Sequence, residues 1–232
     1  MSIEVQHEVM SYERAEELVG AHDKIGVAPC ICRREQKMKG EGCDGPEETC
    51  LQFGILADYW VRRHTARLIN QQEAMDILKQ ADASGLVLQP SNSKEAAFLC
   101  CCCGCCCAVL RNIKRHPKPA SIVSTPFVAT MNSATCTGCA TCIDRCQTEA
   151  LRLEADKAAL NAERCIGCGL CVSTCPTDSL ALMRKPKSEQ AEVPKDFDHT
   201  LIKIGKNRGK LSTAGMVKML VKSKVDRFLA AR

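Results

Sequence analysis

The spacing of apolar residues in the first half of the chain predicts helices with a few short strands between them. A loose alternation over residues 2–9 and the apolar run 86–88 indicate strands. Apolar residues three or four positions apart indicate helices over residues 12–24, 46–60 and 71–84. These periodicities favour a mostly helical first half.

Local capping signals support the predicted helix starts. Ser11 stands where an N-cap is expected for the first helix. Pro46 and the glutamates after it suit the first turn of the second helix, which would then hold Cys50. Asn70 and Glu73 form a capping box at the start of the third helix. We therefore expect a rigid helix to position Cys50.

The pattern changes after residue 115. Prolines between residues 115 and 130 indicate a connector, and short strands are predicted over residues 150–153 and 159–161. Beyond Arg184 the chain is charged, and its end predicts an amphipathic helix that packs on its own chain or on a partner, with a membrane-surface helix as the alternative. The apolar face of this helix comprises Val217, Leu220, Val221, Val225, Phe228 and Leu229.

These elements predict an α+β protein in three parts. Residues 1–120 form a mostly helical cysteine-rich domain, residues 130–185 form a module of short β-hairpins and helices, and residues 186–232 form a charged linker and an amphipathic helix. Only 3% of the 232 residues are aromatic, so the apolar core is thin. A chain with a thin core usually needs additional cross-links to stabilise its fold, which are disulfides or metal centres.

The chain has nineteen cysteines, which could form either kind of cross-link. The first residues show no secretory signal, and an odd number of thiols cannot all be paired. No apolar run approaches the roughly 20 residues of a membrane span. We therefore expect a reduced, cytoplasmic and anaerobic setting in which most of the cysteines bind metal.

The formal net charge of +5 favours a polyanion partner only weakly. That count treats every cysteine as neutral, and thiolates bound to metal centres would add negative charge. We therefore expect no nucleic-acid partner.

A doubled cysteine motif carries the most specific chemistry. The spacing C-x2-C-x2-C-x3-C occurs at Cys136, Cys139, Cys142 and Cys146, and again at Cys165, Cys168, Cys171 and Cys175. A loop of this spacing can wrap three sulfurs around one four-iron cubane, and the fourth sulfur of the motif ligates the other cluster. Zinc, which commonly takes separated C-x2-C pairs, fits the doubled pattern less well.

Residues 130–185 thus resemble a bacterial-type ferredoxin with two 4Fe-4S clusters. The interleaved pattern assigns Cys175 to the cluster of the first three cysteines and Cys146 to the cluster of Cys165, Cys168 and Cys171. One residue departs from the family pattern, because Gln147 stands where the first repeat usually carries proline.

Eleven further cysteines lie in the first half, more than the eight that two cubanes need. Neighbouring residues of an extended backbone point to opposite sides, so the run 100–107 suits two sites better than one. We expect Cys30, Cys32, Cys43 and Cys50 to share one site and the run to feed a second, with one or two further iron–sulfur clusters; zinc, Cu(I) or free thiols are the alternatives. The ligands expected from the run are Cys100, Cys102, Cys103, Cys105 and Cys106.

Arg33 and Arg34 follow Cys32 directly. Two interpretations are open for them. They can offset the charge of a cluster, or they can form a solvated surface pair.

The chain as a whole resembles a group of cysteine-rich ferredoxin-domain proteins of anaerobic prokaryotes. The resemblance rests on Pro29–Arg33, Cys43, Glu48–Leu51, Gly85–Val87, the run 100–107 and residues 165–171. It implies an electron-transfer subunit that relays single electrons between a low-potential donor and a partner oxidoreductase, such as a flavoprotein or another iron–sulfur subunit. A redox enzyme with a catalytic cluster for thiol–disulfide reduction and a redox sensor are the alternatives. No dinucleotide-binding motif and no catalytic residue is expected.

Overall fold

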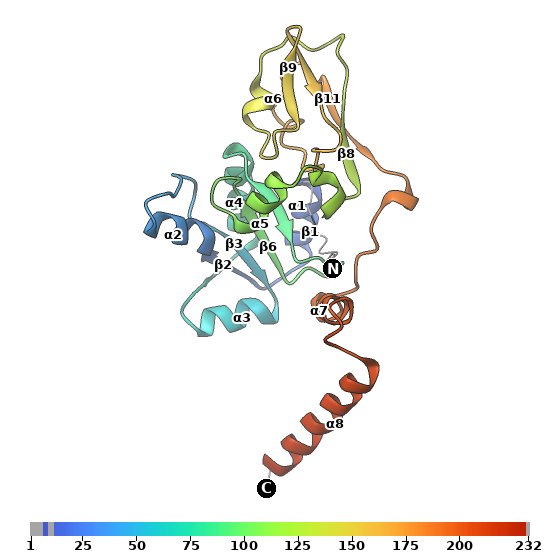
Figure 1. Ribbon diagram of the computed structural model, residues 1–232. Coiled ribbons are helices and arrows are strands. Elements are labelled where there is room, and N and C mark those ends of the chain that lie inside the picture. The colour runs from blue at the N-terminus through green and yellow to red at the C-terminus, as the bar shows by residue number, and fades with distance from the viewer. Residues whose placement is uncertain (1–6, 9–11, 231–232) are drawn as a thin grey trace.

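The computed structural model describes residues 7–8 and 12–230 (Figure 1). The strand predicted over residues 2–9 falls mainly outside them, as does the cap at Ser11. The described part is strand β1 (His7–Glu8), which pairs in parallel with β7 (Val123–Ser124). Among the described residues, no helix has both the length and the apolar character needed to cross a bilayer.

A five-stranded antiparallel sheet forms the centre of the first half, in the order β4-β2-β3-β6-β5. Its strands are β2 (Ile25–Pro29), β3 (Glu48–Phe53), β4 (Arg67–Ile69), β5 (Val87–Pro90) and β6 (Phe98–Cys102). Helices α1 (Tyr12–Gly20) and α4 (Gln71–Ala83) bury one face of the sheet. Helices α2 (Ile31–Met38), α3 (Ile55–Arg62) and α5 (Ala108–Arg115) connect the strands or follow them.

The expectation of a mostly helical first half is wrong where it concerns Cys50, which lies in strand β3 and not in a helix. Gly54 adopts a positive φ of 55° after this strand, and α3 begins only at the next residue. The residues before Gly54 alternate between the two faces of the sheet, so that Leu51 enters the core and Cys50 points to the opposite face. The apolar spacing across residues 46–60 combined a strand and a helix into one apparent helical face.

The second half contains two small antiparallel ladders. Strand β8 (Phe127–Met131) pairs with β11 (Leu180–Arg184), and β9 (Leu151–Glu154) pairs with β10 (Lys157–Leu160). The helix α6 (Thr141–Asp144) and the 3-10 turn η1 (Pro119–Ile122) complete this part. The two strands predicted near residues 150 and 160 are thus confirmed.

The charged C-terminal segment contains more structure than a linker. After the 3-10 turn η2 (Lys187–Glu189), helix α7 (Phe197–Asn207) packs on the first half, and α8 (Thr213–Ala230) extends away from it (Figure 1). The Phe197 ring meets the Phe98 ring edge-on at 5.7 Å, and the Thr200 hydroxyl donates to the Asn92 carbonyl at 2.6 Å. On α8 the described apolar side chains Val217, Leu220 and Val221 are exposed.

Candidate iron–sulfur and metal sites

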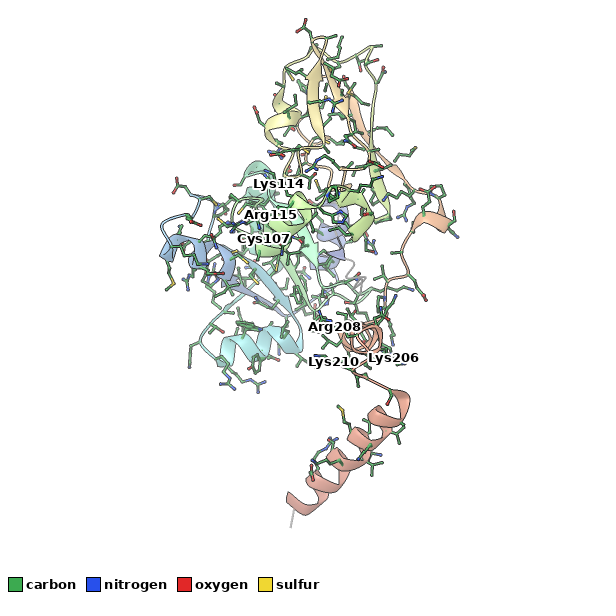
Figure 2. All side chains as sticks on the ribbon, viewed as in Figure 1. Cys107, Lys114, Arg115, Lys206, Arg208 and Lys210 are labelled. Carbon is green, nitrogen blue, oxygen red and sulfur yellow. The ribbon has the colours of Figure 1, made fainter. Side chains whose placement is uncertain are left out.

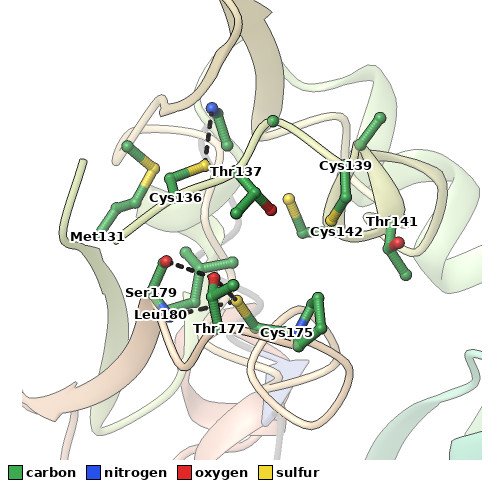
Figure 3. Close-up of a pocket in the computed structure, with 14 residues that line it drawn as sticks. Met131, Cys136, Thr137, Cys139, Thr141, Cys142, Cys175, Thr177, Ser179 and Leu180 are labelled. Carbon is green, nitrogen blue, oxygen red and sulfur yellow. Dashed lines mark hydrogen bonds between the residues drawn. The ribbon is translucent and has the colours of Figure 1, made fainter. Parts of the chain in front are cut away.

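Four sulfurs from both ferredoxin repeats surround one small cavity. Cys136, Cys139 and Cys142 come from the first loop and α6, and Cys175 comes from the second repeat (Figure 3). The Ser179 N–H donates to Cys175 Sγ at 3.2 Å. Hydrogen bonds from the backbone and hydroxyl of Thr141 lower the pKa of the exposed Cys139 thiol. We name this the outer cavity.

The other four sulfurs line a second cavity of similar size. Cys165, Cys168 and Cys171 surround it together with Cys146 from the first repeat. The backbone N–H groups of Ala129 and Ala150 donate to Cys165 Sγ at 3.4 Å and to Cys146 Sγ at 3.1 Å. We name this the inner cavity, because Cys168 faces the first half.

Two glycines allow the chain to pass closely around these cavities. Gly138 and Gly167 have φ values of +71° and +65°, which side-chain-bearing residues rarely adopt. A Cβ atom at either position would stand 2.2 Å from a backbone carbonyl oxygen, that of Asp156 or of Phe127. Both loops therefore require glycine.

The donor sets fit four-iron clusters. Each cavity offers four cysteine sulfurs, with backbone N–H groups directed at some of them, which is the arrangement that clusters require. Burial raises the pKa of the Cys168 thiol to about 12, so a bound cation is needed to hold this sulfur as a thiolate at neutral pH. The division of the eight sulfurs follows the interleaved spacing, and their ligation of iron stays a prediction.

A much larger cavity opens on the face of the sheet opposite to α1 and α4. Its volume is about 410 Å³, against about 20 Å³ for each ferredoxin cavity. Seven cysteines line it, and all but Cys101 carry their sulfurs on this side of the sheet, so we name it the six-sulfur pocket. The six are Cys30, Cys32, Cys50, Cys100, Cys102 and Cys107.

Strand alternation and helix geometry bring these sulfurs together. Cys50 and Cys100 are direct cross-strand partners in β3 and β6, and Cys102 lies on the same face of β6 as Cys100. Cys107 stands at the N-cap of α5, where the backbone N–H groups of Val109 and Leu110 reach its sulfur. Cys101 lies on the opposite face, in the apolar core.

Hydrogen bonds among the thiols give this pocket two acidic sulfurs. Donation from the Cys102 and Cys50 thiols lowers the pKa of Cys100 well below its usual range. Donation from Cys102, helped by backbone N–H groups of α5, lowers the pKa of Cys107 to about 6. The same contacts raise the pKa of Cys50 and Cys102. The pocket therefore presents thiolates ready to bind a soft metal.

Helix α7 forms part of the wall of the six-sulfur pocket. Phe197, Thr200 and Lys203 are among the residues that line it, together with Gln89 of β5, whose amide donates to Cys107 Sγ at 3.7 Å. The sequence analysis missed all four. No spacing signal could have revealed them, since β5 and α7 reach the pocket only through the tertiary fold.

The remaining four cysteines of the first half form a compact group, which we name the tetrad: Cys43, Cys103, Cys105 and Cys106. Burial raises the pKa of the Cys43 thiol, but hydrogen bonds from the Gly45 N–H and from neighbouring thiols outweigh it and hold that pKa at about 7. The expectation that Cys43 shares a site with Cys30, Cys32 and Cys50 is therefore wrong. Cys43 follows α2 and meets the turn between β6 and α5.

The run of cysteines thus serves both sites, as its alternation indicates. Cys100, Cys102 and Cys107 face the six-sulfur pocket, whereas Cys103, Cys105 and Cys106 belong to the tetrad. Cys107 was missed as a candidate ligand, because no helix was predicted over the residues of α5, whose N-cap it occupies.

One apolar cluster connects the inner cavity with the six-sulfur pocket. Cys168 packs against the same cluster as Cys100, Cys102 and Cys107. Its buried members include Ile166 and Leu170 from the ferredoxin loop and Val87, Leu110 and Ile113 from the first half. Packed protein rather than water therefore separates the two sites.

Polar contacts fix the ferredoxin part on the first half. Arg145 donates to the carboxylate and the carbonyl of Asp82 at 2.9 and 2.7 Å. The Gln147 side chain donates to the Gly85 carbonyl at 2.9 Å and accepts from the Gly104 N–H at 2.7 Å. Figure 2 shows Lys114 at the end of α5, and its ammonium lies 2.8 Å from the Glu149 carboxylate.

Comparison with known proteins agrees with these cavities. No curated protein matches the chain. Residues 129–183 match the family model described as a 4Fe-4S dicluster domain. This part of the chain, which contains both ferredoxin cavities, is a ferredoxin-type iron–sulfur segment.

Proposed function

We propose that the chain is an electron-transfer subunit that relays single electrons through three iron–sulfur clusters. Two 4Fe-4S clusters would bind in the outer and inner cavities, and a third would bind in the six-sulfur pocket. Each bound cluster accepts and donates one electron at a time. The observation that carries the proposal is the shared apolar cluster between Cys168 and the sulfurs Cys100, Cys102 and Cys107.

The exposure of the cysteines supports a direction for this path. Cys139 of the outer cavity is exposed, whereas the Cys165 residue of the inner cavity is buried. The two ferredoxin cavities are themselves joined, because Cys146 and Cys171 pack in the apolar clusters of both. A soluble redox donor would meet the outer cavity, and electrons would pass through the inner cavity to the six-sulfur pocket.

The partner that accepts these electrons would be a redox protein, such as a flavoprotein or another iron–sulfur subunit. Three basic side chains, Lys206, Arg208 and Lys210, lie around the end of α7 (Figure 2), and residues of the same helix line the six-sulfur pocket. Such a basic group would attract an acidic partner surface and speed up encounter.

The size of the six-sulfur pocket favours one alternative function. With about 410 Å³, it has room for a small molecule beside a cluster. A catalytic cluster there would reduce an organic disulfide, in which two electrons from the ferredoxin clusters and two protons break the S–S bond and release two thiols.

Freeze-quench electron paramagnetic resonance distinguishes these functions. The anaerobic full chain is mixed with limiting dithionite, and the signals of the ferredoxin clusters should appear first and then decline as a third signal grows. The rate of this exchange should not depend on protein concentration, because the transfer is intramolecular. A rate proportional to concentration, or the absence of a third signal, contradicts the relay. Consumption of added 2-hydroxyethyl disulfide by the reduced chain would establish the catalytic alternative.

A further inference from the structure

The sulfurs of the tetrad lie unusually close to one another. Cys43 Sγ is 3.8 Å from Cys103 Sγ and 3.6 Å from Cys106 Sγ, and Cys105 Sγ is 3.7 Å from Cys106 Sγ. All four sulfurs lie within 4.8 Å of one another. These separations are too long for disulfides, whose sulfurs are about 2.05 Å apart.

This spacing is that of ligands around a single ion. A tetrahedral Zn²⁺ ion with Zn–S bonds of about 2.3 Å holds its four sulfurs about 3.8 Å apart. A cubane spreads its thiolates further, because each binds a different iron atom. The ferredoxin segment provides an internal comparison, since the structure describes all eight of its cysteines and no three of their sulfurs lie within 4.8 Å of one another.

We propose that the tetrad binds one Zn²⁺ ion in a closed structural site. Four thiolates complete the tetrahedral coordination and leave no position open for water or substrate, as in other structural zinc sites. This inference goes beyond the proposed electron relay, because the ion has no redox role. It also assigns the iron of the first half to the six-sulfur pocket alone.

A buried arginine supplies the charge that such a site needs. One Zn²⁺ ion with four thiolates has a net charge of −2. Arg33 is fully buried and donates to three uncharged oxygens, those of Pro46, Thr49 and Cys101, and its Nε has no hydrogen-bond partner among the described residues. A buried guanidinium without a counter-charge is costly. The zinc–thiolate centre would provide that counter-charge.

The position of Gly45 shows how close this arginine comes to the tetrad. A Cβ atom at Gly45 would stand 3.2 Å from Arg33 Nε and 3.3 Å from Cys43 Sγ. The Arg33 guanidinium and the Cys43 sulfur therefore both lie close to this glycine.

The ion would link two parts of the chain that are distant in sequence. Cys43 lies in the loop after α2, and the other three cysteines form the turn between β6 and α5. That turn also contains Gly104, which hydrogen-bonds Gln147 of the ferredoxin segment. A structural ion here would stabilise the surface on which the segment docks and compensate for a thin apolar core.

Metal analysis of the anaerobically purified full chain tests the proposal, with zinc and iron both supplied during expression. The wild type should contain about one zinc per chain by the four-ligand stoichiometry. Cys43→Ser should contain about tenfold less zinc per chain than the wild type and the same amount of iron. Cys101→Ala is the matched control, because it removes a thiol of the same run that packs in the apolar core and belongs to neither sulfur set, and it should retain both metals. Loss of iron from Cys43→Ser, or a wild type without zinc, overturns the proposal.

X-ray absorption at the zinc edge needs no variant, so it applies even if Cys43→Ser fails to fold. The wild type should show four sulfur neighbours of zinc at about 2.3 Å. Nitrogen or oxygen neighbours would show that the tetrad does not hold the zinc and would overturn the assignment.

Discussion

Two adjacent arginines have opposite environments. Arg33 is fully buried between the sulfur sites, whereas Arg34 is exposed and lies 4.0 Å from the exposed Glu47 carboxylate. The sequence left both interpretations open for the pair. Arg34 is solvated, and the charge-offsetting role of the buried Arg33 stays a prediction. Their environments differ because α2 directs neighbouring side chains to different faces of the helix.

Replacing Arg33 should therefore cost far more stability than replacing its neighbour. Arg33→Gln leaves the oxygens of Pro46, Thr49 and Cys101 short of donors, and we expect it to lower the free energy of unfolding by about 3 kcal/mol. Arg34→Gln removes only an exposed ion pair, for which we expect less than about 0.5 kcal/mol. Anaerobic urea titration followed by circular dichroism measures both, and equal losses would contradict the buried role of Arg33.

The interleaved ligation is testable with a matched pair of variants. Cys175→Ala should disturb the cluster of the outer cavity, because its sulfur faces Cys136, Cys139 and Cys142. Cys146→Ala should disturb the cluster of the inner cavity instead. In each case we expect loss of about one of the two ferredoxin signals in the paramagnetic spectrum of the reduced protein. The assignment fails if Cys175→Ala affects the cluster of Cys165, Cys168 and Cys171.

Elements with strong local signals were predictable. Asn70 caps α4 by accepting from the Glu73 N–H at 2.8 Å, as the capping box predicts, and α4 ends just before Gly85. The strand around Cys50 was not predictable, since its residues fit a helical spacing equally well and only pairing with β2 and β6 decides for a strand. Helix α7 was missed because its contacts with the first half lie far away in sequence.

Helix α7 should protect the six-sulfur pocket from oxygen. Phe197→Ala removes the aromatic contact with Phe98, which is worth about 1 kcal/mol, and loosens the helix over the pocket. We expect the iron content of the anaerobic protein to stay unchanged and the absorbance of its clusters to bleach several-fold faster in air. Leu201→Ala is the control, because Leu201 lies on the same helix but is half exposed. Equal bleaching rates for both variants would show that α7 does not shield the pocket.

At the scale of the whole molecule, the sequence predicted the ferredoxin segment well and the cysteine-rich half poorly. A ferredoxin loop takes three ligands from neighbouring positions, so its spacing alone defines a cavity. The six-sulfur pocket takes its ligands from β3, β6 and the starts of α2 and α5, and only the sheet register brings Cys50 opposite Cys100. Gln147 shows this difference most clearly. It departs from the proline of the ferredoxin pattern, and its side chain docks the ferredoxin segment on the first half.

Gln147→Pro should therefore uncouple the two halves, although it restores the usual ferredoxin residue. Proline cannot make the contacts with the Gly85 carbonyl and the Gly104 N–H. We expect both ferredoxin clusters to remain, limited proteolysis near residue 125 to become several-fold faster, and electron transfer to the third cluster to slow. Gln80→Ala, an exposed glutamine of α4, is the control. A wild-type proteolysis rate for Gln147→Pro would contradict the docking role.

The most direct test of the account counts iron and acid-labile sulfide in the anaerobically purified chain while a reductive titration is followed by electron paramagnetic resonance. With clusters in both ferredoxin cavities and in the six-sulfur pocket, we predict about twelve irons per chain and a third paramagnetic signal beside the two of the ferredoxin segment. About eight irons, with no signal beyond those two, would contradict a third cluster and with it the electron path into the first half.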